Sequence, residues 1–349
     1  MRPDRQSRIC RAAVTRGLVA AAFSIGCASS TQAAIDVTPP PIPRAVRQAA
    51  ATGRALIERM QRADARICFI GVQTSRVSYP GGIATSQQRM YRLGNRSLRL
   101  DFLSGPGGLA GETIVDNGTT FYHYLPARRT MDEGPSRLHR ERLRARQMLD
   151  LIKSGQVTAR NLGRDEVAGR SCTIVELRLA DTSAPWRAFW VDDATGVQLK
   201  NGQYRNDGSI LSSSALTEVR FVDSIPVSTF AAPKVAAGTH VQRIAVPHKS
   251  TVAEVQARAG FPIKQPTYIP SGYQFDAAGM SRFYGAPMVT LRYTDGPRVI
   301  SLFEMQGTGA SEGPSHPTAD VSISFVGGLK IVAVGGATGD MDRMLASMR

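Results

Sequence analysis

The chain has 349 residues, of which 42% are hydrophobic and 20% are charged, and its formal net charge is +15. This length is sufficient for two domains of ordinary size, and the hydrophobic fraction excludes disorder over most of the chain. The 33 glycines and 20 prolines are spread along the chain as turn residues, which favours a β-rich fold with short connections.

The first 34 residues have the features of an export signal. Five arginines within the first 16 residues precede the short apolar run Gly17–Ala28, and Thr31-Gln32-Ala33 supplies small residues before a cleavage point. The run is too short to cross a bilayer as a stable helix. We therefore predict soluble export to the periplasm or cell envelope. An uncleaved membrane anchor is one alternative, and a lipoprotein acylated at Cys27, within the degraded lipobox Ser24-Ile25-Gly26-Cys27, is another.

Cleavage after residue 34 leaves a net charge of +11, because that stretch contains five arginines and one aspartate. Such a balance favours acidic partners, namely anionic lipid head groups, lipopolysaccharide phosphates or an acidic protein segment. Nucleic acid is the usual partner of a protein this basic, but an exported chain rarely meets it, and we predict none. The alternative is an arginine-rich genome, since arginine outnumbers lysine throughout the chain.

The mature chain begins with elements of both helical and strand type. Residues 35–43 carry four prolines and predict an extended lead-in. Residues 44–63 place apolar side chains on one face of an amphipathic helix. Strands over 68–77 and 85–93 then form a hairpin across Tyr79-Pro80-Gly81-Gly82.

Further strands are expected over 97–102, 112–116 and 119–125. Asn117-Gly118 joins the last two, since both of these residues tolerate the positive φ of a tight hairpin turn. A helix over 137–153 follows, with apolar residues as an irregular stripe.

The stretch 167–199 predicts three strands joined by turns. In its first strand, Val175 and Leu177 alternate with Ile174 and Glu176 in a pattern close to period two, which predicts one buried face. Asp192-Asp193 precedes a Thr-Gly turn, where turn capping is the expected role. Another strand follows over 209–221. Repeated antiparallel hairpins with one or two interposed helices predict an open barrel whose helices cover its mouth or inner face.

The remaining residues predict a linker and a second domain. Small residues make 233–249 linker-like, and 250–349 forms a compact α/β domain. A helix over 251–259 has Ser250 or Thr251 as its N-cap. Strands over 289–293, 299–304, 321–326 and 329–334 precede a closing helix over 340–348.

Several phrases resemble, in order and spacing, the periplasmic sigma-E regulators of the RseB/MucB type. They are Val115-Asp116-Asn117-Gly118 with Tyr124-Leu125-Pro126, the stretch Val167–Lys200, Tyr268-Ile269-Pro270-Ser271-Gly272-Tyr273, Tyr293-Thr294-Asp295-Gly296, and the closing Val332–Met348. The resemblance covers most of the mature chain. It is loose at Arg66–Gly71, where the family's early phrase is only distantly matched.

The resemblance implies an α+β fold. Residues 44–232 would form a half-open antiparallel β-barrel with covering helices, like that of the lipoprotein carrier LolA, and 250–349 the smaller α/β domain. It also implies a regulator without enzymatic activity, which binds the periplasmic segment of a membrane anti-sigma factor and controls its proteolysis. Lipid, lipopolysaccharide or lipoprotein acyl chains would be sensed in an apolar barrel cavity. A LolA-like carrier of lipid or lipoprotein is the alternative function, and a homodimer is left open.

Two residue sets are candidates for structural or ligand contacts. Cys68 and Cys172 survive cleavage inside predicted strands, where they either form a disulfide or stay buried as thiols. Arg137, Arg140 and Arg144 fall on one face of a helix. Their guanidinium groups suit phosphate or carboxylate, and a solvated helix face is the alternative.

Phe189 and Trp190 are the candidates for lining a cavity. Alternation directs them to opposite faces of a strand, so one lies inside and the other outside, and core packing is the alternative for both. The five histidines are widely separated, and no G-x-S-x-G or phosphate-loop motif occurs. We therefore predict no catalytic site, metal site or cofactor.

Overall fold

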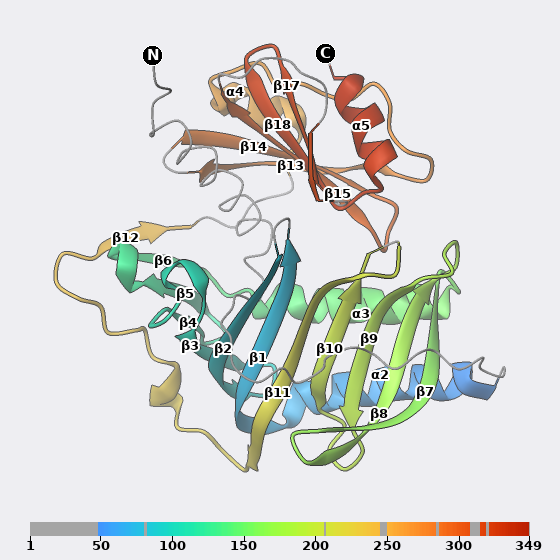
Figure 1. Cartoon of the computed structure of the whole chain (residues 1–349). Helices are drawn as coiled ribbons and strands as arrows, with labels where there is room; N and C mark the ends of the chain where they lie inside the picture. The colour runs from blue at the N-terminus through green and yellow to red at the C-terminus, as the bar shows by residue number, and fades with distance from the viewer. Residues whose placement is uncertain are drawn as a thin grey trace. The chain divides into compact units, whose positions relative to one another are not determined.

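The computed structural model describes residues 48–79, 82–205, 207–244, 250–283, 286–307, 315–318 and 321–348 (Figure 1). The predicted export signal, the lead-in and Cys27 lie outside these residues. The chain divides into two compact units, Met1–Ala245 and Val246–Arg349, and the division falls inside the linker predicted over 233–249. None of the described helices is long and apolar enough to cross a membrane.

The described part of the first unit contains two α-helices, three 3-10 turns and twelve strands. The helices are α2 (Gln48–Arg66) and α3 (Leu138–Lys153), and the 3-10 turns are η1 (Pro106–Gly108), η2 (Pro126–Arg128) and η3 (Val227–Phe230). The strands are β1 (Cys68–Tyr79), β2 (Gly82–Leu93), β3 (Ser97–Ser104), β4 (Thr113–Asp116), β5 (Thr120–Leu125), β6 (Thr130–Pro135), β7 (Val157–Val167), β8 (Arg170–Leu179), β9 (Pro185–Asp192), β10 (Gln198–Tyr204), β11 (Ile210–Val222) and β12 (His240–Arg243).

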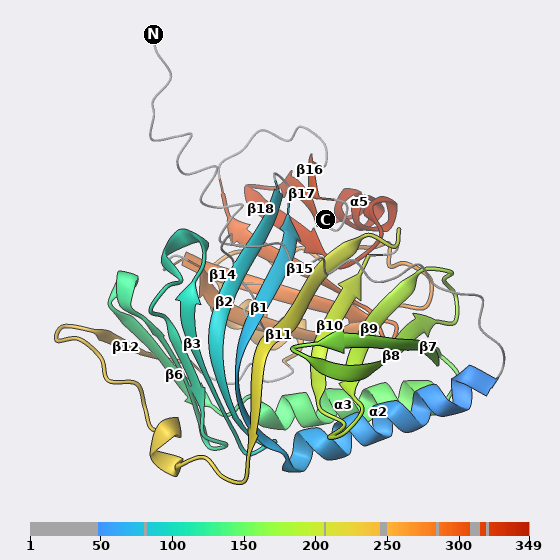
Figure 2. The same cartoon turned by 60° about the horizontal axis from the view of Figure 1, so that its bottom comes forward.

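All of these strands belong to one sheet, in the order β12-β6-β5-β4-β3-β2-β1-β11-β10-β9-β8-β7. Consecutive strands form hairpins from β1 to β6 and from β7 to β11, and β11 returns beside β1. The strands β12 and β7 stand at the two ends of the sheet and do not pair with each other. The unit is therefore a half-open, mainly antiparallel barrel with covering helices, as the sequence predicted (Figure 2).

Helices α2 and α3 pack on one face of this sheet, which we call the helix-covered face. Ile57 and Met60 of α2 are buried in one cluster with Val175, Leu177 and Phe189. The same cluster receives partly buried apolar side chains of α3, namely Met148, Leu149, Leu151 and Ile152. The apolar stripes of both helices thus form a core with the β7–β9 end of the sheet.

A glycine allows α2 to approach the sheet closely. A Cβ atom at Gly53 would lie 2.4 Å from the carbonyl oxygen of Ala159 in β7. That distance is shorter than any ordinary contact, and a backbone oxygen has little freedom to move away. The helix therefore needs a residue without a side chain at this position.

Strand β8 is buried on both of its faces, although its alternation predicted one. Val175 and Leu177 are 0% exposed on the helix-covered face, and Ile174 and Glu176, which alternate with them, are 2% and 1% exposed. The second face is buried because Ile174 belongs to another cluster, which also contains Trp190. Alternation therefore located the faces correctly but underestimated how much of the strand is covered.

Part of the predicted linker is a strand. β12 lies parallel to β6, and the N–H groups of His240 and Ile244 donate hydrogen bonds to the carbonyl oxygens of Arg129 (2.8 Å) and Glu133 (2.6 Å). A Cβ atom at Gly134 would lie 2.6 Å from the Ile244 carbonyl oxygen, so glycine permits this approach. The extended chain after η3 thereby covers the edge of β6.

The second unit is a six-stranded antiparallel sheet with helices on one face. Its helices are α4 (Val252–Ala259) and α5 (Thr338–Ala346), and its described strands are β13 (Gln274–Phe283), β14 (Ala286–Thr294), β15 (Val299–Gln306), β16 (Ser315–Thr318), β17 (Val321–Val326) and β18 (Leu329–Val334), in the order β13-β14-β15-β18-β17-β16. Thr251 caps α4 in a capping box with Glu254, which resolves the two predicted caps in favour of Thr251.

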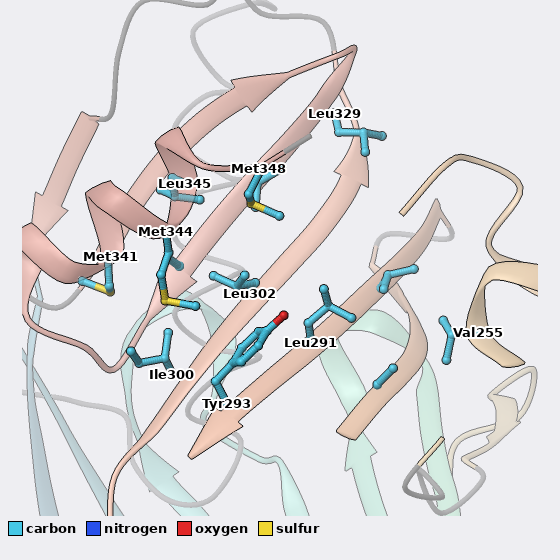
Figure 3. Packing of buried hydrophobic residues seen from close by; sticks show 14 of the residues in the cluster. Val255, Leu291, Tyr293, Ile300, Leu302, Leu329, Met341, Met344, Leu345 and Met348 are labelled. Carbon is cyan, nitrogen blue, oxygen red and sulfur yellow. The ribbon is translucent and has the colours of Figure 1, made fainter. Parts of the chain in front are cut away.

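One core joins both helices to the second sheet. Val255 of α4 and Met344 of α5 are each 0% exposed, and they belong to one cluster with Leu291, Ile300 and Leu302 of the sheet (Figure 3). Figure 3 shows the methionines of α5 above Ile300 and Leu302. The α/β character predicted for 250–349 follows from this packing.

Strand β15 places a carboxyl group inside this unit. Glu304 is 0% exposed, and its Oε2 accepts a hydrogen bond from the Lys264 N–H at 2.9 Å. Its Oε1 is buried without a hydrogen-bond partner among the described residues. Burial raises the pKa of Glu304 to about 7, against the opposing effects of the Lys264 N–H and the Lys264 charge.

Replacing Gly53 by alanine should destabilise the first unit, although alanine is the better helix former by about 1 kcal/mol. The expected loss in free energy of unfolding is about 1–3 kcal/mol, because the new methyl group meets the Ala159 carbonyl oxygen. Gly339→Ala in α5 is the matched control, since a Cβ atom there meets nothing within 4 Å and should stabilise slightly. Urea unfolding of the mature chain measures both. Equal effects of the two substitutions would contradict the close approach.

The stability of the second unit should fall as pH rises from 5 to 8. A raised carboxyl pKa contributes stability that is complete below the unfolded value of 4.5 and is lost as pH passes through about 7. The expected change reaches on the order of 3 kcal/mol, and Glu304→Gln should abolish it. Hydrogen exchange of the β14 and β15 amides in the full mature chain, corrected for intrinsic rates, provides the measurement. A pH dependence that persists in the Glu304→Gln variant would show that another group is responsible.

Candidate binding surface

The three arginines of the predicted patch have different surroundings in the structure. The backbone N–H of Arg137 donates a 2.6 Å hydrogen bond to Oδ2 of Asp116 in β4, and its guanidinium carbon lies 3.6 Å from the centre of the Phe121 ring. Burial, followed by the charge of Arg140, lowers the pKa of Arg137. Arg137 thus joins the start of α3 to β4 and β5.

Arg140 and Arg144 are exposed on α3. Arg140 acts electrostatically on Arg137, one turn earlier, whereas the charge of Arg144 acts on Glu141 and on Arg187 of β9. On the predicted helix face, Arg137 therefore contacts β4 and β5, whereas the charge of Arg144 acts on β9. The role of Arg137, Arg140 and Arg144 as an anion-binding patch remains a prediction.

A charged cluster joins α2, β2 and α3. Nη2 of Arg92 lies 3.7 Å from Oε2 of Glu141, and the Nε of Arg92 is buried without a hydrogen-bond partner among the described residues. Burial raises the pKa of both Asp64 and Glu141, and the charge of Arg92 partly opposes each increase. The charge of Arg92 thus acts on two carboxyl groups, those of Asp64 and Glu141, at a position with little access to water.

An open groove of about 350 Å³ runs along α2 beside α3. The residues that line it are mostly polar or charged, namely Glu58, Gln61, Arg62, Ala65, Arg66 and Leu149. Gln61 closes one side of it, since its Nε2 donates a 2.6 Å hydrogen bond to the Ala145 carbonyl oxygen across the two helices.

Polar side chains cross the helix-covered face beyond the helices. Nδ2 of Asn201 donates to Oγ of Ser214 at 2.8 Å, and Nε2 of Gln73 donates to the same oxygen at 3.2 Å. Nε2 of Gln88 donates to Oε1 of Gln73 at 2.8 Å and to Oγ of Ser75 at 2.9 Å. The register aligns Asn201, Ser214 and Ser75 with Phe189, and it pairs Gln73 with Gln88 two residues along β1 and β2. We call these polar side chains the polar row.

A histidine and two carboxyl groups lie at the β4–β6 end of the sheet. Nε2 of His123 is 2.8 Å from Oε2 of Glu112, and Asp132 is paired with His123 in the strand register. Burial raises the pKa of Asp132, and the charges of His123, Arg137 and Arg128 oppose the increase. No three such groups gather closely enough to hold a metal ion in the part of the chain that is described.

Asp192 caps its turn, as the sequence predicted. Its Oδ2 accepts hydrogen bonds from the N–H and hydroxyl of Thr195 at 2.7 and 2.6 Å, and its Oδ1 accepts one from Nε of Arg170 at 2.7 Å. Burial alone would raise the pKa of Asp192, but the bonds from Arg170 and Thr195 lower it overall. The acid is structural rather than available for chemistry.

The two candidate cavity residues are buried in separate clusters. Phe189 is 5% exposed beneath α2 and α3, and Trp190 is 1% exposed. Trp190 also donates a 2.7 Å hydrogen bond to Oδ2 of Asp165, and Nζ of Lys200 lies 4.1 Å from the centre of its ring. Both side chains are packed as core, so a role in lining a cavity remains a prediction that requires the surrounding elements to move.

The two cysteines are free and buried in the structure, which corresponds to the buried-thiol alternative. Cys68 begins β1 and Cys172 lies in β8, and the sheet places β11, β10 and β9 between them. Four strand spacings of about 4.8 Å separate their backbones, whereas a bridge requires Cα atoms within about 7 Å.

Sequence reasoning did not single out Arg187, Asp64, Arg92 or the polar row. Alternation could have located one of them, because Arg187 stands two residues before Phe189 and must share its face. The polar row lacked such a signal, since serine and glutamine in a strand commonly face solvent.

The comparisons with known proteins give one family match and several fold likenesses. The model described as the MucB/RseB N-terminal domain matches residues 53–235. A chain in the complex structure of Pseudomonas aeruginosa MucA/MucB is similar at 17% identity, covering 85% of this chain and 98% of that chain, with a TM-score of 0.54. A chain in the crystal structure of MucB in complex with MucA(peri) has 19% identity, the same coverage and a TM-score of 0.50. These likenesses show the fold.

A LolA superfamily protein from Nitrosomonas europaea also matches, at 11% identity over 51% of this chain and 97% of that chain, with a TM-score of 0.26. No curated protein sequence matches the chain.

The mature protein should contain two thiols that react only after unfolding. Cys68 and Cys172 are 5% and 0% exposed, and burial raises the pKa of Cys172 to about 12, so its thiolate is scarce at neutral pH. Intact mass under non-reducing conditions, together with Ellman titration with and without guanidinium chloride, tests this. A mass about two daltons below the reduced value would mean that the two cysteines bridge in the exported protein.

Proposed function

Because the chain belongs to the family described as the MucB/RseB N-terminal domain, we propose that it is an exported regulator that binds the periplasmic segment of a membrane anti-sigma factor. The observation that carries the proposal is the family match over 53–235, joined to a fold likeness that extends over 98% of a chain from the MucA/MucB complex. The ordered sequence phrases in both units support the same assignment.

Binding would control proteolysis of the anti-sigma factor by shielding its segment from the first protease cut. Lipid, lipopolysaccharide or a mislocalised lipoprotein would relieve the shielding. The net charge of +11 after cleavage at residue 34 supports an acidic partner or an anionic amphiphile. The predicted contact is the patch of Arg137, Arg140 and Arg144, of which Arg140 and Arg144 are exposed on α3.

We propose a binding role without catalysis, in the periplasm. The carrier alternative uses the same half-open barrel, but the family match and the second unit favour the regulator. The likeness to a chain of the MucA/MucB complex covers 85% of this chain, which is more than the first unit alone.

Affinity purification from the protein's own membranes tests the regulator directly. The tagged mature protein should capture a single-pass membrane protein whose gene lies beside a sigma factor, and native mass spectrometry of the eluate should report any co-purified lipid and a dimer if one exists. An exported bait of equal net charge controls for non-specific ionic capture. Lipid or lipoprotein recovered without such a partner would contradict the regulator and leave the carrier.

A further inference from the structure

Arg187 is a cation on the helix-covered face with no carboxylate beside it among the described residues. The register pairs it with Leu177 of β8 and Gln203 of β10. Its guanidinium carbon lies 4.9 Å from the centre of the Trp186 ring. Its Nε is sealed from solvent and has no hydrogen-bond partner in the described part of the chain, while part of the side chain remains exposed. A ligand would therefore approach the guanidinium from the partly exposed side of the residue, since Nε itself is closed to solvent.

This position is electrostatically unfavourable in the free protein. Burial and then the nearby charge of Arg144 lower the pKa of Arg187. An arginine still stays protonated at neutral pH, so the fold carries two neighbouring positive charges instead of releasing a proton. Burying a charge without a partner costs several kcal/mol in general. An anion that enters this position would offset that cost.

The surroundings of Arg187 suit a hydrogen-bonding ligand. On the same face, Gln203 stands beside it, Ser212 follows in the register, and the polar row lies one step farther along the strands. An acyl chain would remove water from the partly exposed amide of Gln203 and hydroxyl of Ser212, which is unfavourable. A polypeptide offers main-chain donors and acceptors at the spacing of a strand, and it can also supply carboxylates.

We propose that Arg187, with Arg144 beside it, binds a side-chain carboxylate of an acidic peptide segment laid over the helix-covered face. The planar guanidinium fork accepts a carboxylate with two parallel hydrogen bonds. The proposal rests on the proposed function, because it assigns the segment to the anti-sigma partner. It places the recognition site in the first unit and predicts that the recognised residue is negatively charged.

The test uses the full mature protein and a fluorescein-labelled octapeptide of alternating glutamate and serine, with a glutamine–serine peptide as the neutral probe. Fluorescence anisotropy should show that Arg187→Met lowers the affinity for the acidic peptide at least about tenfold, because a charge-assisted hydrogen bond is lost. Arg146→Met, an exposed arginine of α3, is the matched control and should change affinity less than about twofold. The neutral peptide should bind wild type and variant equally weakly.

Urea unfolding separates a binding role from a structural one. Removing an uncompensated charge in Arg187→Met should leave the unfolding midpoint unchanged or higher, although binding falls. A lower midpoint with unchanged peptide affinity would overturn the proposal and make Arg187 structural. Stronger competition by phosphatidylglycerol vesicles or inorganic phosphate than by the glutamate peptide would also overturn it, in favour of a phosphate site. Peptide binding without capture of an anti-sigma factor from membranes would retain the site and reject only the partner.

Discussion

The contact between α2 and strands β7, β8 and β9 sets the form of the first unit. Ile57 is completely buried there, and each such side chain contributes about 1.5–3 kcal/mol when removed from water. Gly53 brings the helix within reach of the β7 backbone. Because two helices occupy this end of the sheet, the strands cannot close around an apolar interior, and the barrel stays half open. Beyond the helices, part of this face carries the polar row.

In that arrangement, several charged side chains of the first unit have little access to water. Asp192 is fully satisfied by Arg170 and Thr195, so its charge contributes to stability. Arg92 is shared between two carboxyl groups, and Arg187 has no carboxylate beside it within the described ranges. Charged side chains whose hydrogen-bonding groups are paired therefore stabilise the fold, whereas those with unpaired groups are candidates for binding a ligand.

Local patterns in the sequence predicted most elements, because their causes are local. Asn117-Gly118 marked its turn, Thr251 capped α4, and both long helices of the first unit begin and end within a few residues of the prediction. Long-range order was not accessible. Nothing in the sequence says that three strands separate Cys68 from Cys172, or that Arg144 lies near Arg187, since such contacts depend on strand order and helix placement. Residues 240–243 were assigned to a linker because strand pairing at an edge uses backbone groups, which composition does not reveal.

An open sheet has two edge strands. The unpaired backbone N–H and C=O groups of each edge could pair with a strand of another molecule. At one end stands β12, a strand of only four residues, all exposed, with His240, Gln242 and Arg243 among them. At the other end β7 carries Arg160 and Arg164 and is interrupted by a bulge between Asn161 and Gly163. Short, charged and irregular edges make poor templates for another strand. The half-open barrel therefore protects itself against fibrillar aggregation, a hazard that a closed barrel would not face.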